Sequence, residues 1–336
     1  MVMLVTLWGL EAGGRAAQPL HIPDGFLSVA VAALCWLVTI ALLAVAVRRT
    51  PALLGERQIP LMGIMAAFIF AAQMINFPVA GGTSGHLLGG ALAAIALGPW
   101  PAMLVMTAVL AVQALLFQDG GLLALGANIL NMGLLTALLA FGLYRAVAGQ
   151  ARGVRLAVAG IAAWLSVMAA ALATSLQLWL SGTADLAVVV PAMLGVHALI
   201  GLGEALITVA ALAFILRTRP ELVEAEGRAG RADRGWIGAG FAVALAVVLL
   251  APFASADPDG LERVAENLGF IEQAAEPSYS LIPDYVLPFL GETAISTILA
   301  GAIGVLVVAA LTLALARLLR PARPVAPPAE AERRTA

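Results

Sequence analysis

Long apolar runs, separated by short breaks that contain arginine, proline and glycine, make up most of this chain. Nine of these runs are candidate helices: 27–47, 59–77, 86–98, 100–117, 122–146, 156–180, 188–216, 236–254 and 293–316. The third run begins at His86 and is too short to cross a bilayer at about 1.5 Å per residue. An irregular stretch from Pro78 to Gly85 precedes it, and non-helical backbone at membrane depth is typical of a lined cavity. The pattern predicts an all-α, polytopic membrane helical bundle of about seven helices plus a C-terminal two-helix hairpin.

Composition supports a lipid-exposed protein. Of 336 residues, 62% are hydrophobic and 11% are charged, whereas a soluble domain has about 45–50% and 25%. A soluble chain of this length would need far more charge to cover its surface, so the lipid bilayer is the expected surrounding. A net charge of -2 gives no reason to expect nucleic acid as a partner. The single cysteine, Cys35, lies in an apolar run, cannot form an intrachain disulfide and is predicted to be a small buried hydrophobe.

The arginines indicate the orientation independently, because cytoplasmic loops of membrane proteins are enriched in basic residues. If the segment after the first run is cytoplasmic, two arginines lie outside, Arg15 and Arg263. The other sixteen lie on the cytoplasmic side: Arg48, Arg49, Arg57, Arg145, Arg152, Arg155, Arg217, Arg219, Arg228, Arg231, Arg234, Arg317, Arg320, Arg323, Arg333 and Arg334. This distribution predicts a multi-pass protein of a bacterial-type inner (plasma) membrane. Five features then share the outer face: His21, the 78–86 loop, Asp119, Asp185 and the acidic stretch 255–292.

The charged segment after the seventh run divides the chain into predicted parts. These are an N-terminal extension at 1–19, a seven-helix membrane domain at 20–216, a cytoplasmic linker at 217–235, a two-span domain at 236–320 and a disordered tail at 321–336. The outer loop of the two-span domain begins with Asp257–Leu261, a turn that leads into a short helix. Its acidic residues either concentrate cations and assist metal loading or belong to a solvated linker.

Three histidines, His21, His86 and His197, lie at or near the outer ends of predicted spans. Imidazole is the commonest transition-metal ligand, although an isolated histidine near a membrane interface more often makes a structural hydrogen bond. Glycines flank His86, which lets the backbone approach a ligand closely. A free amine at Leu20, the amide and ring nitrogens of His21 and a ring nitrogen of His86 would together form a planar nitrogen set. Such a set favours Ni(II) or Cu(II), and Co(II) would require the geometry to adapt.

Several long motifs resemble the CbiM/NikM family, the cobalt and nickel substrate-binding membrane components of energy-coupling factor (ECF) transporters. The resemblance covers about residues 20–216 and rests on five segments: His21–Leu27, Met65–Pro78, Gly81–Gly90, Gly126–Met132 and His197–Ala205. In addition, 255–318 is similar to a small two-span partner with a PDGLE-type loop, here Pro258–Glu262, fused to the same chain.

This resemblance implies the ligands, the substrate and the partners. The metal would be held by the N-terminal amine, by the backbone and ring nitrogens of His21, and by His86. Nickel or cobalt would be the transported substrate, with no permanently bound cofactor. A transmembrane coupling subunit and two cytoplasmic ATPases would power uptake, so the chain is expected to be a transporter subunit rather than an enzyme. The fused two-span partner favours nickel slightly.

The chain departs from the family at its beginning. The family usually starts Met-His-Ile-Pro, whereas nineteen residues precede Leu20 here and hold the expected amine in a peptide bond. Either Leu20 corresponds to a misread start codon, which we favour, or 1–19 is a signal peptide that is removed.

Other polar residues have two interpretations. Glu204 lies well inside a span, with His197 seven residues earlier on the same face, and is either an ion-path residue or a structural hydrogen-bond partner. Thr83 and Ser84 in the glycine-rich loop, with Asn76, Asn128 and Asn131, either surround the ion or bond between helices. Two alternative functions follow from these residues. One is an ion-coupled secondary metal carrier with Glu204 as its proton site. The other is an intramembrane enzyme that uses His86 with Ser84 or Glu204, although no HExxH or nucleophile-elbow motif supports it.

Overall fold

A computed structural model describes residues 21–223 and 235–320. Leu20, the predicted extension 1–19, most of the predicted linker 217–235 and the predicted tail 321–336 lie outside these ranges.

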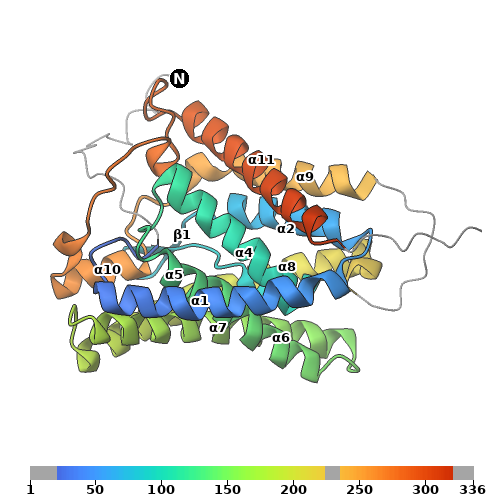
Figure 1. Ribbon diagram of the computed structural model, residues 1–336, viewed down its shortest axis with the longest axis horizontal. Coiled ribbons are helices and arrows are strands. Elements are labelled where there is room, and N and C mark those ends of the chain that lie inside the picture. Colours follow the sequence, from blue (N-terminus) through green and yellow to red (C-terminus); the bar gives the residue numbers. More distant parts are fainter. Residues whose placement is uncertain (1–20, 224–234, 321–336) are drawn as a thin grey trace, which may run out of the picture.

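The described chain is a bundle of long apolar helices (Figure 1). Seven helical stretches in the described residues are long and apolar enough to cross a membrane. They are α1 (Val29–Arg49) with η1 (Thr50–Leu53), α4 (Pro99–Val112) with η2 (Gln113–Phe117), α5 (Leu125–Asn128) with η3 (Ile129–Leu135) and α6 (Thr136–Ala146), α7 (Arg152–Leu180), α8 (Leu186–Thr218), α9 (Gly235–Val248) with η5 (Ala251–Phe253), and α11 (Ala294–Leu318). A shorter apolar helix, α2 (Gln58–Gln73), joins them. The predicted all-α, multi-pass fold is therefore confirmed.

The short third run forms α3 (Gly90–Leu97), and all eight of its residues are buried. It packs among α4, α6, α7 and α8. Gly98, with φ +82°, and Pro99 separate it from α4, which explains the break between the third and fourth apolar runs. A Cβ on Gly90 would lie 2.0 Å from Oγ1 of Thr136 and 2.5 Å from the carbonyl oxygen of Met132, so this position requires glycine for close helix packing.

The two-span segment, α9 and α11, packs against α2 as part of the same bundle (Figure 1). Glycines make this contact close. A Cβ on Gly63 would meet the side chain of Leu313, and a Cβ on Gly304 would meet the ring of Phe70. Small residues let membrane helices approach one another where no hydrophobic driving force exists between them. The outer loop that connects α9 to α11 is thereby held over the ends of the other helices.

The stretch predicted to be irregular contains a two-stranded antiparallel hairpin. Strands β1 (Phe77–Val79) and β2 (Thr83–Gly85) pair with Pro78 opposite Ser84. Gly81 and Gly82 have φ of +79° and +67°, which the tight turn requires. The absence of helix was predicted correctly, but the strand pairing was not, because three-residue strands carry no detectable sequence periodicity.

The outer loop of the two-span segment lies on this hairpin. Ser84 donates from its amide to the Pro258 carbonyl oxygen at 2.8 Å and from its hydroxyl to the Asp257 carbonyl oxygen at 2.7 Å. The guanidinium of Arg263 donates to the Gly82 carbonyl oxygen. The predicted short helix is α10 (Gly260–Leu268), and its first turn is buried. The interpretation as a solvated linker is therefore wrong for this segment, because the turn and α10 are packed against the membrane domain.

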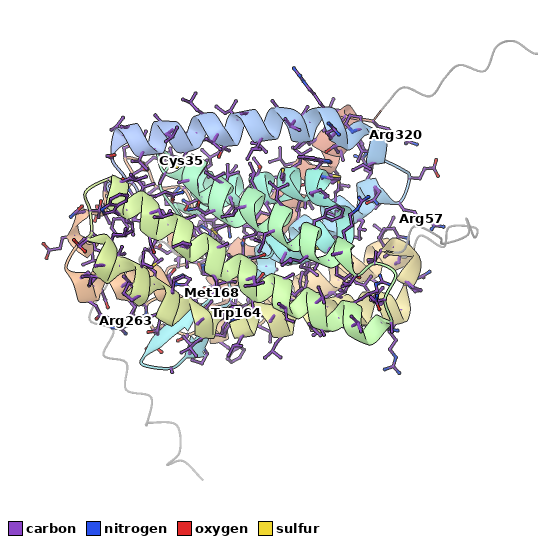
Figure 2. The ribbon with its side chains drawn as sticks, turned by 90° about the horizontal axis from the view of Figure 1, so that it is seen from below. Cys35, Arg57, Trp164, Met168, Arg263 and Arg320 are labelled. Carbon is purple, nitrogen blue, oxygen red and sulfur yellow. The ribbon has the colours of Figure 1, made fainter. Side chains whose placement is uncertain are left out.

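The two ends of the bundle differ in charge. Figure 2 shows Arg57 and Arg320 at one end and Arg263 at the other. Arg320, after α11, lies 3.6 Å from Glu56 in the connection between α1 and α2. This arrangement agrees with the predicted division of these three arginines between two faces of the membrane.

Candidate metal centre

A turn immediately before α1 holds His21. The Ile22 amide donates to Oδ1 of Asn128 at 3.1 Å, and the Asn128 side-chain amide donates back to the Ile22 carbonyl oxygen at 3.1 Å. The carboxylate of Asp24 accepts from the amides of Leu122 and Ala124 at 3.0 and 2.9 Å. Reciprocal bonds of this kind fix the backbone, so His21 is positioned by the loop between α4 and α5.

The imidazole of His21 is paired with a buried carboxylate. Its Nδ1 lies 3.1 Å from Oδ1 of Asp119, and Oδ2 of Asp119 accepts a 2.6 Å hydrogen bond from the Tyr285 hydroxyl. Burial by itself would lower the pKa of His21, but the charge and hydrogen bonds of Asp119 raise it above its ordinary value. Burial would conversely raise the pKa of Asp119, but His21 and the Tyr285 hydrogen bond lower it. Both shifts favour a charged pair in the metal-free protein.

His86 faces His21 across the site. The ring centroids are 5.4 Å apart with an interplanar angle of 84°. Nδ1 of His86 lies 3.1 Å from the carbonyl oxygen of Leu87, which places the ring proton on Nδ1 and leaves a lone pair on Nε2. Both imidazoles line a cavity of about 70 Å³. Nε2 of His21 is buried and has no hydrogen-bond partner among the described residues.

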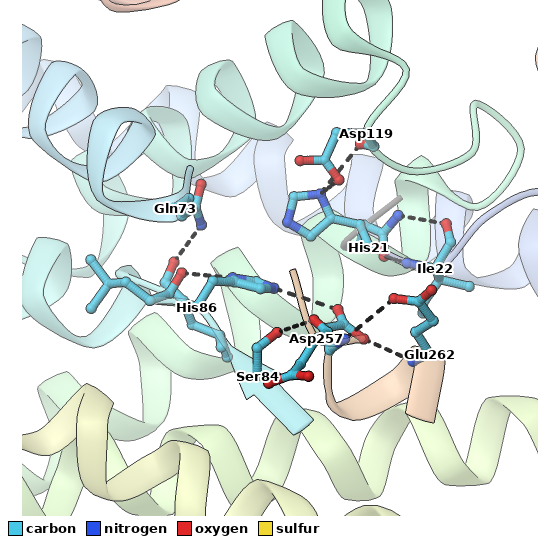
Figure 3. A network of polar contacts seen from close by, with 12 residues as sticks. His21, Ile22, Gln73, Ser84, His86, Asp119, Asp257 and Glu262 are labelled. Atoms are coloured by element: carbon cyan, nitrogen blue, oxygen red, sulfur yellow. Dashed lines mark hydrogen bonds and ion pairs between the residues drawn. The ribbon is translucent and has the colours of Figure 1, made fainter. Parts of the chain in front are cut away.

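Figure 3 shows the imidazoles of His21 and His86 near one another, with Asp119 paired to His21. The turn before α10 brings a further carboxylate, that of Asp259, to the cavity. Oδ2 of Asp259 lies 3.9 Å from Nε2 of His86. Asp259 is 4% exposed, and burial raises its pKa to about 7, although hydrogen bonds from the backbone of α10 oppose the shift. A cation beside this carboxylate would offset the cost of burying its charge.

The other predicted candidates lie at several places. His197 lines the cavity, and its Nδ1 donates to the Met193 carbonyl oxygen at 2.8 Å. Asn128 and Asn131 also line it. Asn131 is additionally bonded to Thr174 and Gln177 of α7 at 3.1 and 2.7 Å, the interhelical role considered for it. Thr83 is buried in β2 beside Ser84, whereas Asn76 accepts a 2.8 Å bond from the Ser255 amide.

Glu204 has a structural position. Its carboxylate accepts from the amides of Leu88 and Gly89 at 2.6 and 3.0 Å, where the chain enters α3. Leu88 and Gly89 directly precede the first residue of α3, Gly90. Glu204 thus fixes the segment that follows His86, which favours the structural reading over a proton site.

Three residues of the site were not identified from the sequence as site residues: Asp119, Tyr285 and Asp259. Asp119 and Tyr285 are distant from His21 in sequence, and neither lies in a motif of its own. Asp259 is part of the recognised Pro258–Glu262 motif, so that motif could have identified it. Within residues 21–223 and 235–320, no group of three or more His, Cys, Asp or Glu side chains is arranged to hold a metal ion.

Comparison with known proteins agrees with this architecture. The model of the CbiM family, described as a cobalt uptake substrate-specific transmembrane region, matches residues 21–222. The chain belongs to the CbiM family. A second family model, the PDGLE domain, matches 234–321. The CbiM-family chain therefore carries a CbiM segment and a PDGLE segment, the two that its motifs resemble. A protein of Archaeoglobus fulgidus with the provisional name fused nickel transport protein NikMN is 40% identical over 306 residues, which cover 90% of this chain and 100% of that protein.

Other relatives of the CbiM-family chain have related names. The fused nickel transport protein NikMN of Rhodobacter capsulatus is 34% identical and covers 67% of this chain and 71% of its own length. The cobalt transport protein CbiM of Geobacter sulfurreducens is 32% identical, with 69% of each chain covered. A crystal structure of a truncated transition metal transporter has a TM-score of 0.53 and 34% identity, and the match covers 59% of this chain and 98% of that one. These relatives are named as transport proteins, as expected for a transporter subunit that is not an enzyme.

Removal of the Tyr285 hydroxyl would test how the pair of Asp119 and His21 affects metal binding. We expect Tyr285→Phe to strengthen metal binding about three- to tenfold near neutral pH, because Asp119 loses a charge-assisted hydrogen bond and holds the protonated ring of His21, with which the ion competes, less tightly. Titration calorimetry of the purified protein would measure the change. Tyr279→Phe is the matched control, since the Tyr279 hydroxyl donates to the Ala114 carbonyl oxygen instead. Equal affinities of Tyr285→Phe and wild type would refute this role for Tyr285.

Proposed function

We propose that the chain captures nickel or cobalt from outside the cell as the substrate-binding subunit of an energy-coupling factor transporter. The observation that supports this most is the pair of buried imidazoles, His21 and His86, which face each other across a cavity that Asp259, at the start of α10, also lines. Arg263 of α10 lies at the end of the bundle away from Arg57 and Arg320 (Figure 2). Because relatives with a fused two-span segment are named for nickel, nickel is the first candidate.

In the proposed site, four nitrogens bind the ion. They are the amine of Leu20 as the mature N-terminus, the amide and ring of His21, and the ring of His86. Leu20 lies outside the described residues. A main-chain nitrogen and the ring of one histidine can close a small chelate ring only through Nδ1, because Nε2 lies on the far side of the imidazole. Nδ1 of His21 lies 3.1 Å from Oδ1 of Asp119, so an ion bound at Nδ1 would take the place of that contact.

The proposed mature N-terminus has a direct test. We expect mass spectrometry of the purified, metal-loaded protein to give a chain whose first residue occupies position 20, as methionine if translation starts there or as leucine if a leader is removed. The amine can reach the ion together with the neighbouring amide only if position 20 is terminal. Intact protein that begins at Met1 and still binds nickel with full affinity would contradict the amine ligand.

Transport would need partners. A transmembrane coupling subunit and two cytoplasmic ATPases would supply the energy, and their rearrangement would release the ion inward. The position of Glu204 as a cap of α3 gives the ion-coupled alternative no support. Nickel accumulation should therefore depend on co-expression of the partners and be lost when the ATPase is inactive. Accumulation by this chain alone, driven by a proton gradient, would contradict the proposal.

Binding should weaken on acidification. Asp119 raises the pKa of His21, so an incoming ion competes with a proton on that ring, and affinity falls as the pH drops through the raised pKa. Asp119→Asn removes the charge that raises this pKa, which should move the fall in affinity to lower pH. His86 and Asp259 also face the cavity and remain in this variant.

Dissociation constants measured between about pH 5 and 8 at constant ionic strength would show this shift. Asp185→Asn is the control, because Asp185 caps α8 at the Ala187 amide and has no contact with His21 among those described. Identical pH profiles for wild type and Asp119→Asn would contradict the assignment.

A further inference from the structure

The two-span segment contributes a carboxylate to the lining of the proposed metal site. Among the described residues that line the cavity shared by His21 and His86, the one carboxylate is Asp259. We propose that Oδ2 of Asp259 is a further donor to the transported ion. This inference rests on the proposed function and adds a ligand from the fused PDGLE domain to the imidazoles of His21 and His86.

The backbone of α10 fixes this carboxylate. Oδ1 of Asp259 accepts from the Glu262 amide at 2.7 Å, and the Glu262 carboxylate accepts from the Asp259 amide at 3.3 Å, which completes a capping box. One carboxylate oxygen is thus used by the helix. The other, Oδ2, lies 3.9 Å from Nε2 of His86.

The distance between the two donor atoms suits a shared ion. Two ligands that are each about 2.1 Å from a metal lie about 3 Å apart in cis positions and about 4.2 Å apart in trans positions. Oδ2 of Asp259 and Nε2 of His86 are 3.9 Å apart, between these limits. The contact of Nδ1 with the Leu87 carbonyl oxygen places the ring proton on Nδ1, so Nε2 is the nitrogen of His86 that would bind an ion. Small adjustments of either side chain would therefore bring both atoms to coordination distance.

A second, independent observation indicates that this cavity holds a ligand. His21 lines the cavity and is 3% exposed, and its buried Nε2 has no hydrogen-bond partner among the described residues. A buried polar atom without a partner is costly unless a ligand or water satisfies it, so Nε2 needs a polar partner while Nδ1 remains the atom that would bind the ion. The volume of about 70 Å³ is sufficient for an ion, and a nitrogen set with one deprotonated amide would compensate only one of the two charges of a divalent ion. The carboxylate of Asp259 supplies both compensation and a donor atom.

The test separates the charge of Asp259 from its role as a helix cap. Asparagine is as good an N-cap as aspartate, so Asp259→Asn keeps the bond to the Glu262 amide and removes the charged donor. Asp257→Asn is the matched control for the loss of one negative charge near the site, because Asp257 lies two residues from Asp259 and its side chain is exposed. Asp185→Asn is the control for the same exchange at another N-cap. Each full-length protein would be titrated anaerobically with Ni(II) and with Co(II), and the d–d absorption of bound Co(II) would report its donor set.

We expect Asp259→Asn to lose at least about tenfold in affinity for both ions and to change the Co(II) spectrum, while both controls match wild type. An unchanged affinity, or a lower affinity with an unchanged spectrum, would overturn the assignment of Asp259 as a donor. His86→Ala, measured in parallel, distinguishes the two proposals. If His86→Ala abolishes binding and Asp259→Asn does not alter it, the nitrogen site stands and this inference fails. If His86→Ala binds normally, the proposed function itself fails.

Discussion

His86→Ala should abolish metal binding and uptake. We expect the affinity for nickel and cobalt to fall more than about 100-fold, because loss of a ligand costs more than the 10- to 100-fold typical of residues around a metal site. His86 is held between β2 and α3 at a ring distance of 5.4 Å from His21, and no other described imidazole has this position. Calorimetric titration and cellular uptake with the partner subunits would measure both losses.

His197→Ala is the matched control for this prediction. His197 lines the same cavity, but its ring is bonded to its own helix through the Met193 carbonyl oxygen, so we expect less than about a tenfold change in affinity. Both variants should be present in the membrane at wild-type levels and melt near the wild-type temperature. Wild-type uptake by His86→Ala would refute the proposed site.

Gly121→Ala should release the turn that carries His21. A Cβ at this position would lie 2.1 Å from Oδ1 of Asp24 and 2.2 Å from its amide nitrogen. The Asp24 carboxylate is fixed by two amides of the same loop and cannot yield easily. We expect a loss of about 1–3 kcal/mol in stability and at least about a tenfold loss in metal affinity, because the His21 turn must move.

Gly142→Ala provides the control for this substitution. No atom lies within 4 Å of a Cβ at Gly142 in α6, and alanine is the better helix former. Thermal unfolding in detergent and nickel titration should therefore give wild-type values for Gly142→Ala. A Gly121→Ala protein with wild-type melting temperature and affinity would show that the His21 turn is not held as described.

The helices and the two histidines could be predicted because their signals are local. Apolar length marks a span, arginines mark one face, and glycines mark the loop before His86. The Asp257–Leu261 turn likewise predicted α10, since the capping box is encoded within four consecutive residues. Each of these features depends on neighbours in sequence, so no tertiary contact was needed to find it.

The contacts that complete the site are not local. Asp119 is 98 residues from His21, and Tyr285 is 166 residues from Asp119, so no spacing in the sequence pairs them. Glu204 caps a helix that begins more than a hundred residues earlier. The outer loop also folds back onto the hairpin through main-chain carbonyls of Asp257 and Pro258, which side-chain chemistry does not reveal. Packing of α9 and α11 against α2 brings these groups together.

The central claim is that nitrogens of His21 and His86 bind one ion. A structure of the nickel-loaded protein, with the metal located by its anomalous scattering, tests it most directly. We predict a single strong peak in the cavity between the two imidazoles, within bonding distance of both rings, with Nδ1 of His21 moved away from Asp119. A peak elsewhere in the molecule, with Nδ1 of His21 still paired with Asp119, would contradict the claim.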